Sequence, residues 1–471
     1  MYCCYSSILQ ICDATIAFPD EFVFTQQIQS PLECTDNAHF GFAVVISGDG
    51  RTAAAACPWS DKELGLVAVY GKSGGQWVQQ ALLNGTDKRE NATEGKCLAI
   101  SSNGNTLASF AAANGEYTQG SIFVYVRNSN GVWHQQAKLD LPDTVPQTFD
   151  CVIKITDDGN TIGVLASAPN THIDLYTRKR KTWSFQAIVN STTMSDLTNF
   201  AFSPDGKLLA IYGTETSKIL IEFFELKNGA WSEPTIPTKF EFTGTISTYA
   251  SALDFTNGVQ NMVSLIMEDV GPVVFSYNGS TYEQSFRYFD TWYLYLSSLA
   301  TDMSGQTLIV GNDMNNRIAV LWRPTTASTN YYYPVQNITS NEITFGQVLD
   351  LSGNGRRLII GASLAANNNG TILFYERPPT NPRCKPSYGI QKATCKRNKK
   401  ICARQDIQLK WTGQGCKNGK RKVGDGGCQC RGYCGYTCKN ACRKDKECKW
   451  IEGSCFVKKT GEIGTSVPVC F

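Results

Sequence analysis

Two segments decide the fold: residues 39–58, HFGFAVVISGDGRTAAAACP, and residues 345–363, FGQVLDLSGNGRRLIIGAS. In each, a short apolar run leads into a turn that contains Asp-Gly or Asn-Gly, and a second apolar run follows. Short apolar runs between turn residues are typical of strands that are buried on both faces. Because the two similar segments lie far apart in one chain, the sequence indicates an internal repeat.

The repeat is found along most of the 471 residues. Each unit continues with a third apolar run, and often with a fourth such as WVQQALL (77–83), so that one unit supplies four strands, the content of one propeller blade. We therefore predict an all-β fold, a seven-bladed β-propeller over residues 18–377. The turn pairs that mark the seven units are Asp49-Gly50, Asn103-Gly104, Asp158-Gly159, Asp205-Gly206, Asn257-Gly258, Ser304-Gly305 and Asn354-Gly355.

The last unit lacks its fourth run, because TILFYERP (371–378) leads into a Pro-rich linker at residues 378–383. The missing strand is expected at the other end of the chain, where FVFTQQIQ (22–29) has the same Gln-Gln pattern as WVQQALL. An N-terminal strand that completes the last blade would close the ring and remove exposed sheet edges.

Residues 39–58 and 345–363 resemble FG-GAP repeats, the propeller repeats of integrin-alpha-like adhesion proteins. The resemblance covers about residues 20–377, and it implies a propeller fold in a secreted or cell-surface protein. Integrin-type repeats bind calcium through loops with alternating acidic residues. The turns here, such as SGDG (47–50) and SGNG (352–355), lack that spacing, so we predict no calcium in the blades and no cofactor.

Residues 384–471 differ in composition from the rest of the chain. From Arg383 onward there are 21 Lys+Arg and 6 Asp+Glu, a charge of +15, which leaves 23 basic and 35 acidic residues upstream, a charge of −12. Twelve of the 19 cysteines lie between Cys384 and Cys470. This density favours a small basic domain held by disulfides in an oxidising compartment, and hence an extracellular or cell-surface location.

Within this segment, Cys434, Cys438 and Cys442 stand four residues apart and would share one face of a helix. Zinc is the alternative to disulfides for these thiols, but the segment contains no histidine. In the propeller, we expect four cysteines to lie on one face of the first three units, as two disulfides or as free thiols. The predicted disulfide cysteines are Cys34, Cys57, Cys97, Cys151, Cys384, Cys395, Cys402, Cys416, Cys428, Cys430, Cys434, Cys438, Cys442, Cys448, Cys455 and Cys470.

Residues 1–17 are interpreted as a possible signal or atypical N-terminal segment, and no apolar run is long enough to span a bilayer, so we predict no transmembrane segment. If the chain is secreted through a eukaryotic pathway, its N-x-[ST] sequons become candidate glycosylation sites. They are Asn84, Asn91, Asn190, Asn278, Asn337 and Asn369.

Few residues are available for catalysis. The three histidines, His39, His134 and His172, fall in three units at positions that are not equivalent, which disfavours a zinc site or a Ser-His-Asp site. We therefore expect no catalytic and no metal site, and a protein that is not an enzyme.

The preferred functional hypothesis is a non-enzymatic structural or adhesion protein, a subunit of an extracellular assembly that is filamentous if ring-to-tail contacts do not close. Its partners would be other copies of itself, matrix or cell-surface proteins, or acidic polysaccharide, but not nucleic acid. The alternatives are a carbohydrate-binding, lectin-like propeller and, third, a propeller glycoside hydrolase.

Overall fold

A computed structural model places the backbone of most of residues 19–378 and, beyond them, four short strands. By spatial contacts the chain divides into two units, Met1–Pro378 and Pro379–Phe471. The predicted linker at residues 378–383, apart from Pro378, lies outside the described residues. The positions not described before residue 379 are 1–18, 36, 89–90, 113–118, 145–150, 167–170, 216–217, 233–238, 244–252, 257–261, 268–270, 278–281, 288–295 and 325–331.

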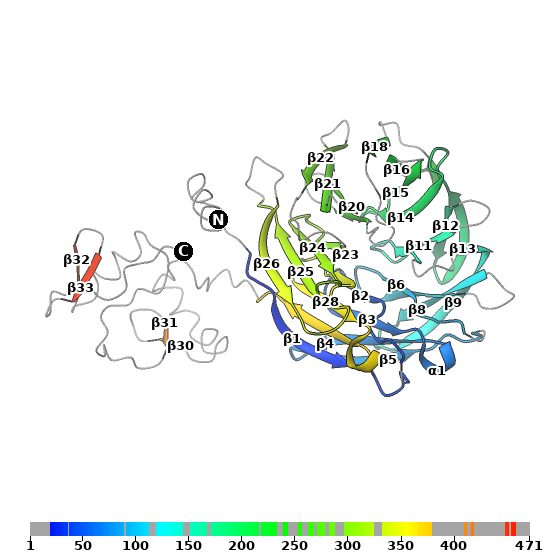
Figure 1. Cartoon of the computed structure of the whole chain (residues 1–471). Helices are drawn as coiled ribbons and strands as arrows, with labels where there is room; N and C mark the ends of the chain where they lie inside the picture. Colours follow the sequence, from blue (N-terminus) through cyan, green and yellow to red (C-terminus); the bar gives the residue numbers. More distant parts are fainter. Residues whose placement is uncertain are drawn as a thin grey trace. The chain divides into compact units, whose positions relative to one another are not determined.

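The first unit is a β-propeller, in which antiparallel sheets are arranged around a common axis (Figure 1). We number its sheets in chain order. Sheet 1 contains β2 (Val44–Ile46), β3 (Thr52–Cys57), β4 (Leu66–Ser73) and β5 (Gln76–Leu83); sheet 2 contains β6 (Cys97–Ile100), β7 (Thr106–Ala111), β8 (Gln119–Arg127) and β9 (Trp133–Thr144); sheet 3 contains β10 (Ile153–Ile155), β11 (Thr161–Ala166), β12 (His172–Lys179) and β13 (Thr182–Val189).

The remaining sheets follow the same order from the axis outward. Sheet 4 contains β14 (Asp196–Phe202), β15 (Leu208–Glu215), β16 (Lys218–Lys227), β17 (Ala230–Ser232) and β18 (Lys239–Thr243); sheet 5 contains β19 (Leu253–Thr256), β20 (Met262–Met267), β21 (Gly271–Tyr277) and β22 (Tyr282–Arg287); sheet 6 contains β23 (Ser298–Thr301), β24 (Thr307–Asn312), β25 (Arg317–Trp322) and β26 (Tyr333–Thr339); sheet 7 contains β27 (Val348–Leu351), β28 (Arg357–Ala362), β29 (Thr371–Glu376) and β1 (Val23–Gln29).

The first strands of successive sheets touch one another in a closed cycle: β2, β6, β10, β14, β19, β23, β27 and again β2. Each of these strands is paired on one side only, so its other edge faces the axis. Apolar side chains fill the space between neighbouring sheets, as where the ring of Trp77 stacks on that of Phe374 with centroids 4.4 Å apart. The core is therefore a series of interfaces between sheets.

The prediction of a seven-bladed propeller of four-stranded units is borne out only in part. Among the described residues, six sheets are four-stranded blades, and sheet 4 has five strands because two short strands share the outer edge of β16. β17 pairs with residues 225–227 of β16, and β18 pairs with residues 218–222. The sequence between β17 and β18 contains Pro234 and Pro237. Proline cannot donate a hydrogen bond to a strand ladder, so this sequence disfavours one continuous outer strand.

The N-terminal strand closes the ring, as the sequence predicts. β1 pairs antiparallel with β29, from Val23 opposite Glu376 to Gln29 opposite Thr371. The next sheet is joined to it through Gln26, whose side-chain oxygen accepts the Trp77 N–H at 2.7 Å and whose side-chain nitrogen donates to the Trp77 carbonyl at 3.0 Å. We call the boundary between sheets 7 and 1 the seam.

The recurring Asp-Gly and Asn-Gly turns owe their form to a hydroxyl two residues before the Asp or Asn. In sheet 1 the Ser47 hydroxyl donates to Asp49 at 2.6 Å and accepts the Thr52 N–H at 3.0 Å, while Gly50 adopts a φ of 69°. The same two hydrogen bonds recur in sheets 2, 3, 4 and 7. This explains the repeated turn signature, since glycine tolerates the left-handed backbone that the turn requires.

The seam also contains a left-handed turn. Helical turn α2 (Ala365–Asn368) has positive φ at Ala366 and Asn367, of 51° and 57°. The carbonyls of its last residue, Asn368, and of the next residue, Asn369, accept the N–H groups of His39 and Phe40 at 3.1 and 2.9 Å. The costly left-handed backbone thus holds sheet 7 to the Phe-Gly segment of sheet 1.

The next boundary repeats this arrangement with one substitution. Helical turn α1 (Ser60–Glu63) has a left-handed backbone at the equivalent two positions. The carbonyls of its last residue and of Leu64 accept the N–H groups of Thr93 and Glu94 at 2.7 and 3.0 Å. Phe40 and Phe345 pack edge-to-face on Tyr70 and Tyr375. In sheet 2 the corresponding position holds Glu94, which is fully buried and accepts a hydrogen bond from the Tyr125 hydroxyl at 2.7 Å.

The second unit contains two short hairpins among its described residues. β30 (Leu409–Trp411) pairs with β31 (Cys416–Asn418), and β32 (Cys448–Ile451) pairs with β33 (Ser454–Val457). The predicted helical face of Cys434, Cys438 and Cys442 lies outside the described residues. None of the helices in the described part of the chain combines the length and hydropathy needed to cross a bilayer.

A substitution at Gly41 tests the seam. A Cβ atom there would lie 2.8 Å from the Thr371 carbonyl oxygen and 3.3 Å from the Gly361 Cα, and Gly41 has a φ of 86°. We expect Gly41→Ala to lower the free energy of unfolding by about 3 kcal/mol or more, because steric overlap adds to left-handed strain.

The matched control is Gly74→Ala, since Gly74 also has a positive φ, 58°, but no atom lies within 4 Å of its added Cβ. We expect this change to cost about 1 kcal/mol. Denaturant unfolding measures both, and equal losses for the two variants would contradict the seam contact.

Candidate functional site

Three charged side chains occupy one register position on the strands around the axis. Lys154, Asp254 and Asp350 each pair with the third residue of the second strand of their sheet. In the other four sheets this position holds Val45, Ala99, Ala201 and Ala300. The charges are therefore at one level of the ring. With Asp157, described below, we call them the axial cluster.

Two of these carboxylates bind the inner edge of the following sheet. The Asp350 Oδ2 atom accepts the Ile46 N–H at 2.7 Å, and the Asp254 Oδ2 atom accepts the Thr301 N–H at 2.9 Å. Strand edges that face the axis have no partner strand, so these carboxylates supply the missing acceptors. Part of their role is to join neighbouring sheets.

The carboxyl of Asp350 has an unusual proton affinity. Burial raises the pKa of Asp350 to about 7, and the nearby Asp254 carboxylate also raises it, whereas the N–H groups of Ile46 and Leu351 and the Lys154 ammonium act to lower it. The group therefore exchanges its proton near neutral pH.

Asp157 lies in the turn between β10 and β11, in contact with the turn of sheet 2. Its carbonyl accepts the Ser102 N–H at 3.1 Å, and Ser102 in turn accepts the Asp49 N–H at 2.9 Å. Burial, together with the charges of Asp254 and Asp158, raises the pKa of Asp157 to about 6. The Asp157 carboxylate makes no side-chain hydrogen bond with the described residues, so its oxygens are available to a ligand.

The axial cluster can exchange protons or bind a cationic or hydroxyl-bearing ligand. It combines carboxyls with raised pKa values and one ammonium group, the combination that general acid–base chemistry uses. No group of three or more His, Cys, Asp or Glu side chains among the described residues is placed to bind a metal ion.

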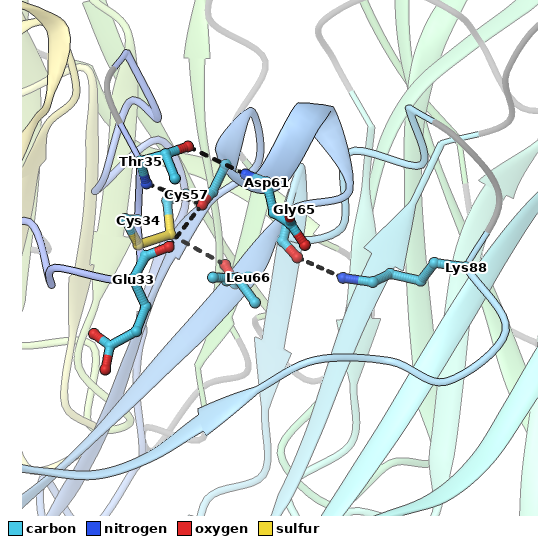
Figure 2. The surroundings of a disulfide bond; sticks show 9 residues. Glu33, Cys34, Thr35, Cys57, Asp61, Gly65, Leu66 and Lys88 are labelled. Atoms are coloured by element: carbon cyan, nitrogen blue, oxygen red, sulfur yellow. Dashed lines mark hydrogen bonds between the residues drawn. A yellow bond between two sulfur atoms is a disulfide. The ribbon is translucent and has the colours of Figure 1, made fainter.

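Two disulfides join parts of the propeller. Cys34 bonds to Cys57, and Cys97 bonds to Cys151. The first attaches the segment after β1 to the end of β3, where the Ser60 hydroxyl donates to the Glu33 carbonyl at 3.0 Å and accepts the Thr35 N–H at 3.1 Å (Figure 2). It therefore reinforces the seam. The second joins sheet 2 to sheet 3.

The three histidines are not brought together. His39 lies at the seam, with its ring 4.9 Å from that of Trp59, and burial lowers its pKa. His134 is exposed on β9, and His172 is buried on β12 with its Nε2 atom 3.4 Å from Asp174 Oδ1. They do not form a joint site.

Among the sequons, Asn84, Asn91, Asn190 and Asn337 are exposed, Asn369 is half-buried, and Asn278 lies outside the described residues. The structure describes only the backbone of three predicted disulfide cysteines in the second unit: Cys416, Cys448 and Cys455. The other nine lie outside the described residues: Cys384, Cys395, Cys402, Cys428, Cys430, Cys434, Cys438, Cys442 and Cys470.

Sequence reasoning missed the axial cluster and the buried Glu94. Besides Tyr125, Glu94 accepts the Gly85 N–H at 2.9 Å and pairs with Lys88 at 3.2 Å, and the Lys88 side chain is only 4% exposed. An alignment of the repeats contains both signals. Glu94 stands where Phe40 and Phe345 stand, and the axial charges stand where other units have Ala or Val.

Comparison with known proteins shows the fold. No family model and no curated protein matches the chain. Among solved structures, the β-propeller domain of Cps50 (Swd1) from Myceliophteria thermophila matches 76% of this chain and 99% of its own, with a TM-score of 0.50 and 11% identity. A candidate 6-phosphogluconolactonase from Bacteroides uniformis matches 64% of this chain and 85% of its own, with a TM-score of 0.48 and 14% identity.

A second candidate 6-phosphogluconolactonase, from Bacteroides fragilis, matches 64% of this chain and 84% of its own, with a TM-score of 0.47 and 13% identity. Propellers with enzyme names thus stand among the structural matches. This contradicts the prediction that the protein is not an enzyme. At these identities the likeness shows the propeller fold alone.

The raised pKa of Asp350 predicts a pH-dependent stability. An unfolded Asp loses its proton near pH 4 and the folded one near pH 7, so the folded state loses stability as pH rises between these values. Asp350→Asn removes this loss and keeps an acceptor for the Ile46 N–H. We expect the melting temperature of the variant to rise relative to wild type between pH 4 and about 7, then to level off.

The control is Asp87→Asn, at an exposed aspartate whose side chain makes no hydrogen bond with the described residues. Its melting temperature should follow that of the wild type throughout this range. A constant difference between Asp350→Asn and wild type over the same range would show that Asp350 ionises as it does in the unfolded chain.

Proposed function

We propose that this protein is an extracellular propeller of FG-GAP type that works in attachment or assembly, with its basic C-terminal segment binding acidic surfaces. The acidic surfaces would belong to other copies of the chain, to matrix or cell-surface proteins, or to acidic polysaccharide. The observation that carries the proposal is the pair of disulfides in the propeller.

The disulfides support the extracellular location. Disulfides persist in oxidising compartments and are rare in reducing ones. Cys57, which is fully buried, is bonded to Cys34, which is 7% exposed, and Cys97 is bonded to Cys151. The repeat pattern does not require a cysteine at any of these positions. The two bridges tie sheet 7 to sheet 1 and sheet 2 to sheet 3, which suits a ring that must survive outside the cell.

Contacts between neighbouring sheets support the FG-GAP assignment. Phe40-Gly41 and Phe345-Gly346 are the Phe-Gly pairs of the resemblance, and both glycines have positive φ, of 86° and 93°. Gly41 donates its N–H to the Ala56 carbonyl at 2.9 Å, and both phenylalanines are fully buried. The Phe-Gly pairs therefore have a physical reason to recur, the close contact between one sheet and the next.

The charge distribution supports assembly. The C-terminal part carries +15 and the remainder −12, so the basic part of one molecule attracts the acidic part of another. A head-to-tail contact of this kind uses two different surfaces, and repeated contacts build a chain of molecules unless they close into a ring.

Light scattering tests this assembly. Salt at physiological concentration reduces the reach of exposed charges to about 8 Å. We expect the full-length protein to form large particles at low salt and to dissociate as salt is raised. The triple variant Lys420→Glu, Arg421→Glu, Lys422→Glu should form smaller particles than the wild type does at the same low salt concentration.

The matched control reverses an identical Lys-Arg-Lys run, residues 179–181, in the exposed turn between β12 and β13. We expect Lys179→Glu, Arg180→Glu, Lys181→Glu not to reduce assembly, because that run belongs to the acidic propeller and its reversal only adds negative charge there. Particles whose size does not depend on salt would contradict assembly by charge.

The axial cluster favours a second candidate function, glycan recognition with hydrolysis. Glycoside hydrolysis uses one protonated and one ionised carboxyl group. Asp157, with a pKa of about 6 and free oxygens, is the candidate acid, and Asp254 is the nearby carboxylate that helps to raise that pKa.

Release of reducing sugars from a panel of polysaccharides tests this second function. We expect Asp157→Asn to abolish release and Asp158→Asn to retain it, because Asp158 is held in its own turn by Thr156 and Asn160. Equal activity of Asp157→Asn and wild type would exclude Asp157 as the acid. Saturable binding without release would leave the lectin-like form of the function.

A further inference from the structure

The outer strands of sheets 1 and 3 end in the same way. β5 ends with half-buried Leu82 and buried Leu83 and is followed by exposed Asn84, while β13 ends with Ile188 and buried Val189 and is followed by exposed Asn190. Residues two apart in an extended chain point to the same side. Each asparagine therefore shares a side with the apolar residue two positions before it.

At Ile188 this arrangement leaves apolar surface in contact with water. Ile188 is 52% exposed, so apolar surface lies next to the Asn190 sequon. A sugar attached to Asn190 would lie over it and remove apolar surface from water. Asn337 repeats the geometry on β26, where it is exposed and Val335, two residues earlier, is only partly buried.

The connection that bears Asn84 and Asn91 is firmly held. Its Lys88 ammonium donates to the Gly65 carbonyl at 2.5 Å and pairs with Glu94, which also accepts the Gly85 N–H (Figure 2 shows the Lys88 contact with Gly65). Asn91 is exposed with a φ of 57°. The buried pair thus turns the two asparagines outward on a fixed support.

Asn369 differs from these four. It is half-buried at the seam, where its side-chain oxygen accepts the Asn37 N–H at 3.1 Å. The hydroxyl of Thr371, the third residue of its sequon, donates to the Ile28 carbonyl at 2.8 Å; burial of this position is not itself the difference, since Thr93 of the Asn91 sequon is also buried. A glycan there would have to pass through the contact between sheets 7 and 1.

We propose that Asn84, Asn91, Asn190 and Asn337 carry N-linked glycans and that Asn369 does not. The sugar at Asn190 covers Ile188. The proposal rests on the extracellular location in the proposed function, since N-glycosylation occurs in the secretory pathway.

Peptide mapping tests the sites. The full chain is secreted from cultured eukaryotic cells and treated with a peptide N-glycosidase in heavy-oxygen water, which converts each glycosylated Asn to labelled Asp. We expect label at the four exposed sites and none at Asn369. Label at Asn369, or none at the exposed sites in a secreted, disulfide-bonded chain, would overturn the proposal, whereas a chain whose propeller cysteines stay reduced would count against the proposed function instead.

Matched variants separate the sequon from the fold. Thr192→Ala destroys the Asn190 sequon and should remove one glycan from the intact mass, while Ser191→Ala leaves the sequon in place and should keep it. Asn190→Gln should raise the binding of a hydrophobic dye, and adding Ile188→Thr should lower it again. Unchanged dye binding in Asn190→Gln would overturn the covering of Ile188.

Discussion

The pairing of β1 with β29 is the contact on which the ring depends. Every other strand pair of the described propeller joins segments that are close in the chain, whereas this one joins residues 23–29 to residues 371–376. Without it, sheet 7 would expose the unpaired edge of β29. Several kinds of contact support the seam: the Cys34–Cys57 disulfide, the left-handed turn α2, and ion pairing between Lys72 and Glu376.

The axial cluster belongs to the same system of contacts. Asp350 acts across the seam, because the Ile46 N–H that it binds belongs to sheet 1. Asp254 does the same between sheets 5 and 6 through Thr301. A carboxylate that joins two sheets has to be partly removed from water, and this burial raises the pKa of Asp350. The contact between sheets at the axis and the raised pKa of Asp350 therefore have one cause.

The features predicted from the sequence are those that repeat. The Asp-Gly and Asn-Gly turns gave the periodicity, and the Gln-Gln pattern of residues 26–27 located the closing strand, because each reflects a local rule of turn or strand chemistry. The two short outer strands of sheet 4 were not predicted, although Pro234 and Pro237 in the sequence between them disfavour one continuous strand. The axial cluster was missed because Lys154, Asp254 and Asp350 meet only through strand register in three sheets. No local pattern marks them as neighbours.

The separation of residues across the seam has a consequence for biosynthesis. The partner of β1 leaves the ribosome only after nearly the whole propeller has been made, so this pairing forms last and has a long loop to close. Cys57, by contrast, follows Cys34 by 23 residues. Once this bond has formed, β1 is held beside sheet 1 while the rest of the chain emerges. A disulfide formed at that stage would keep β1 near the place where it later pairs with β29, and away from other nascent chains.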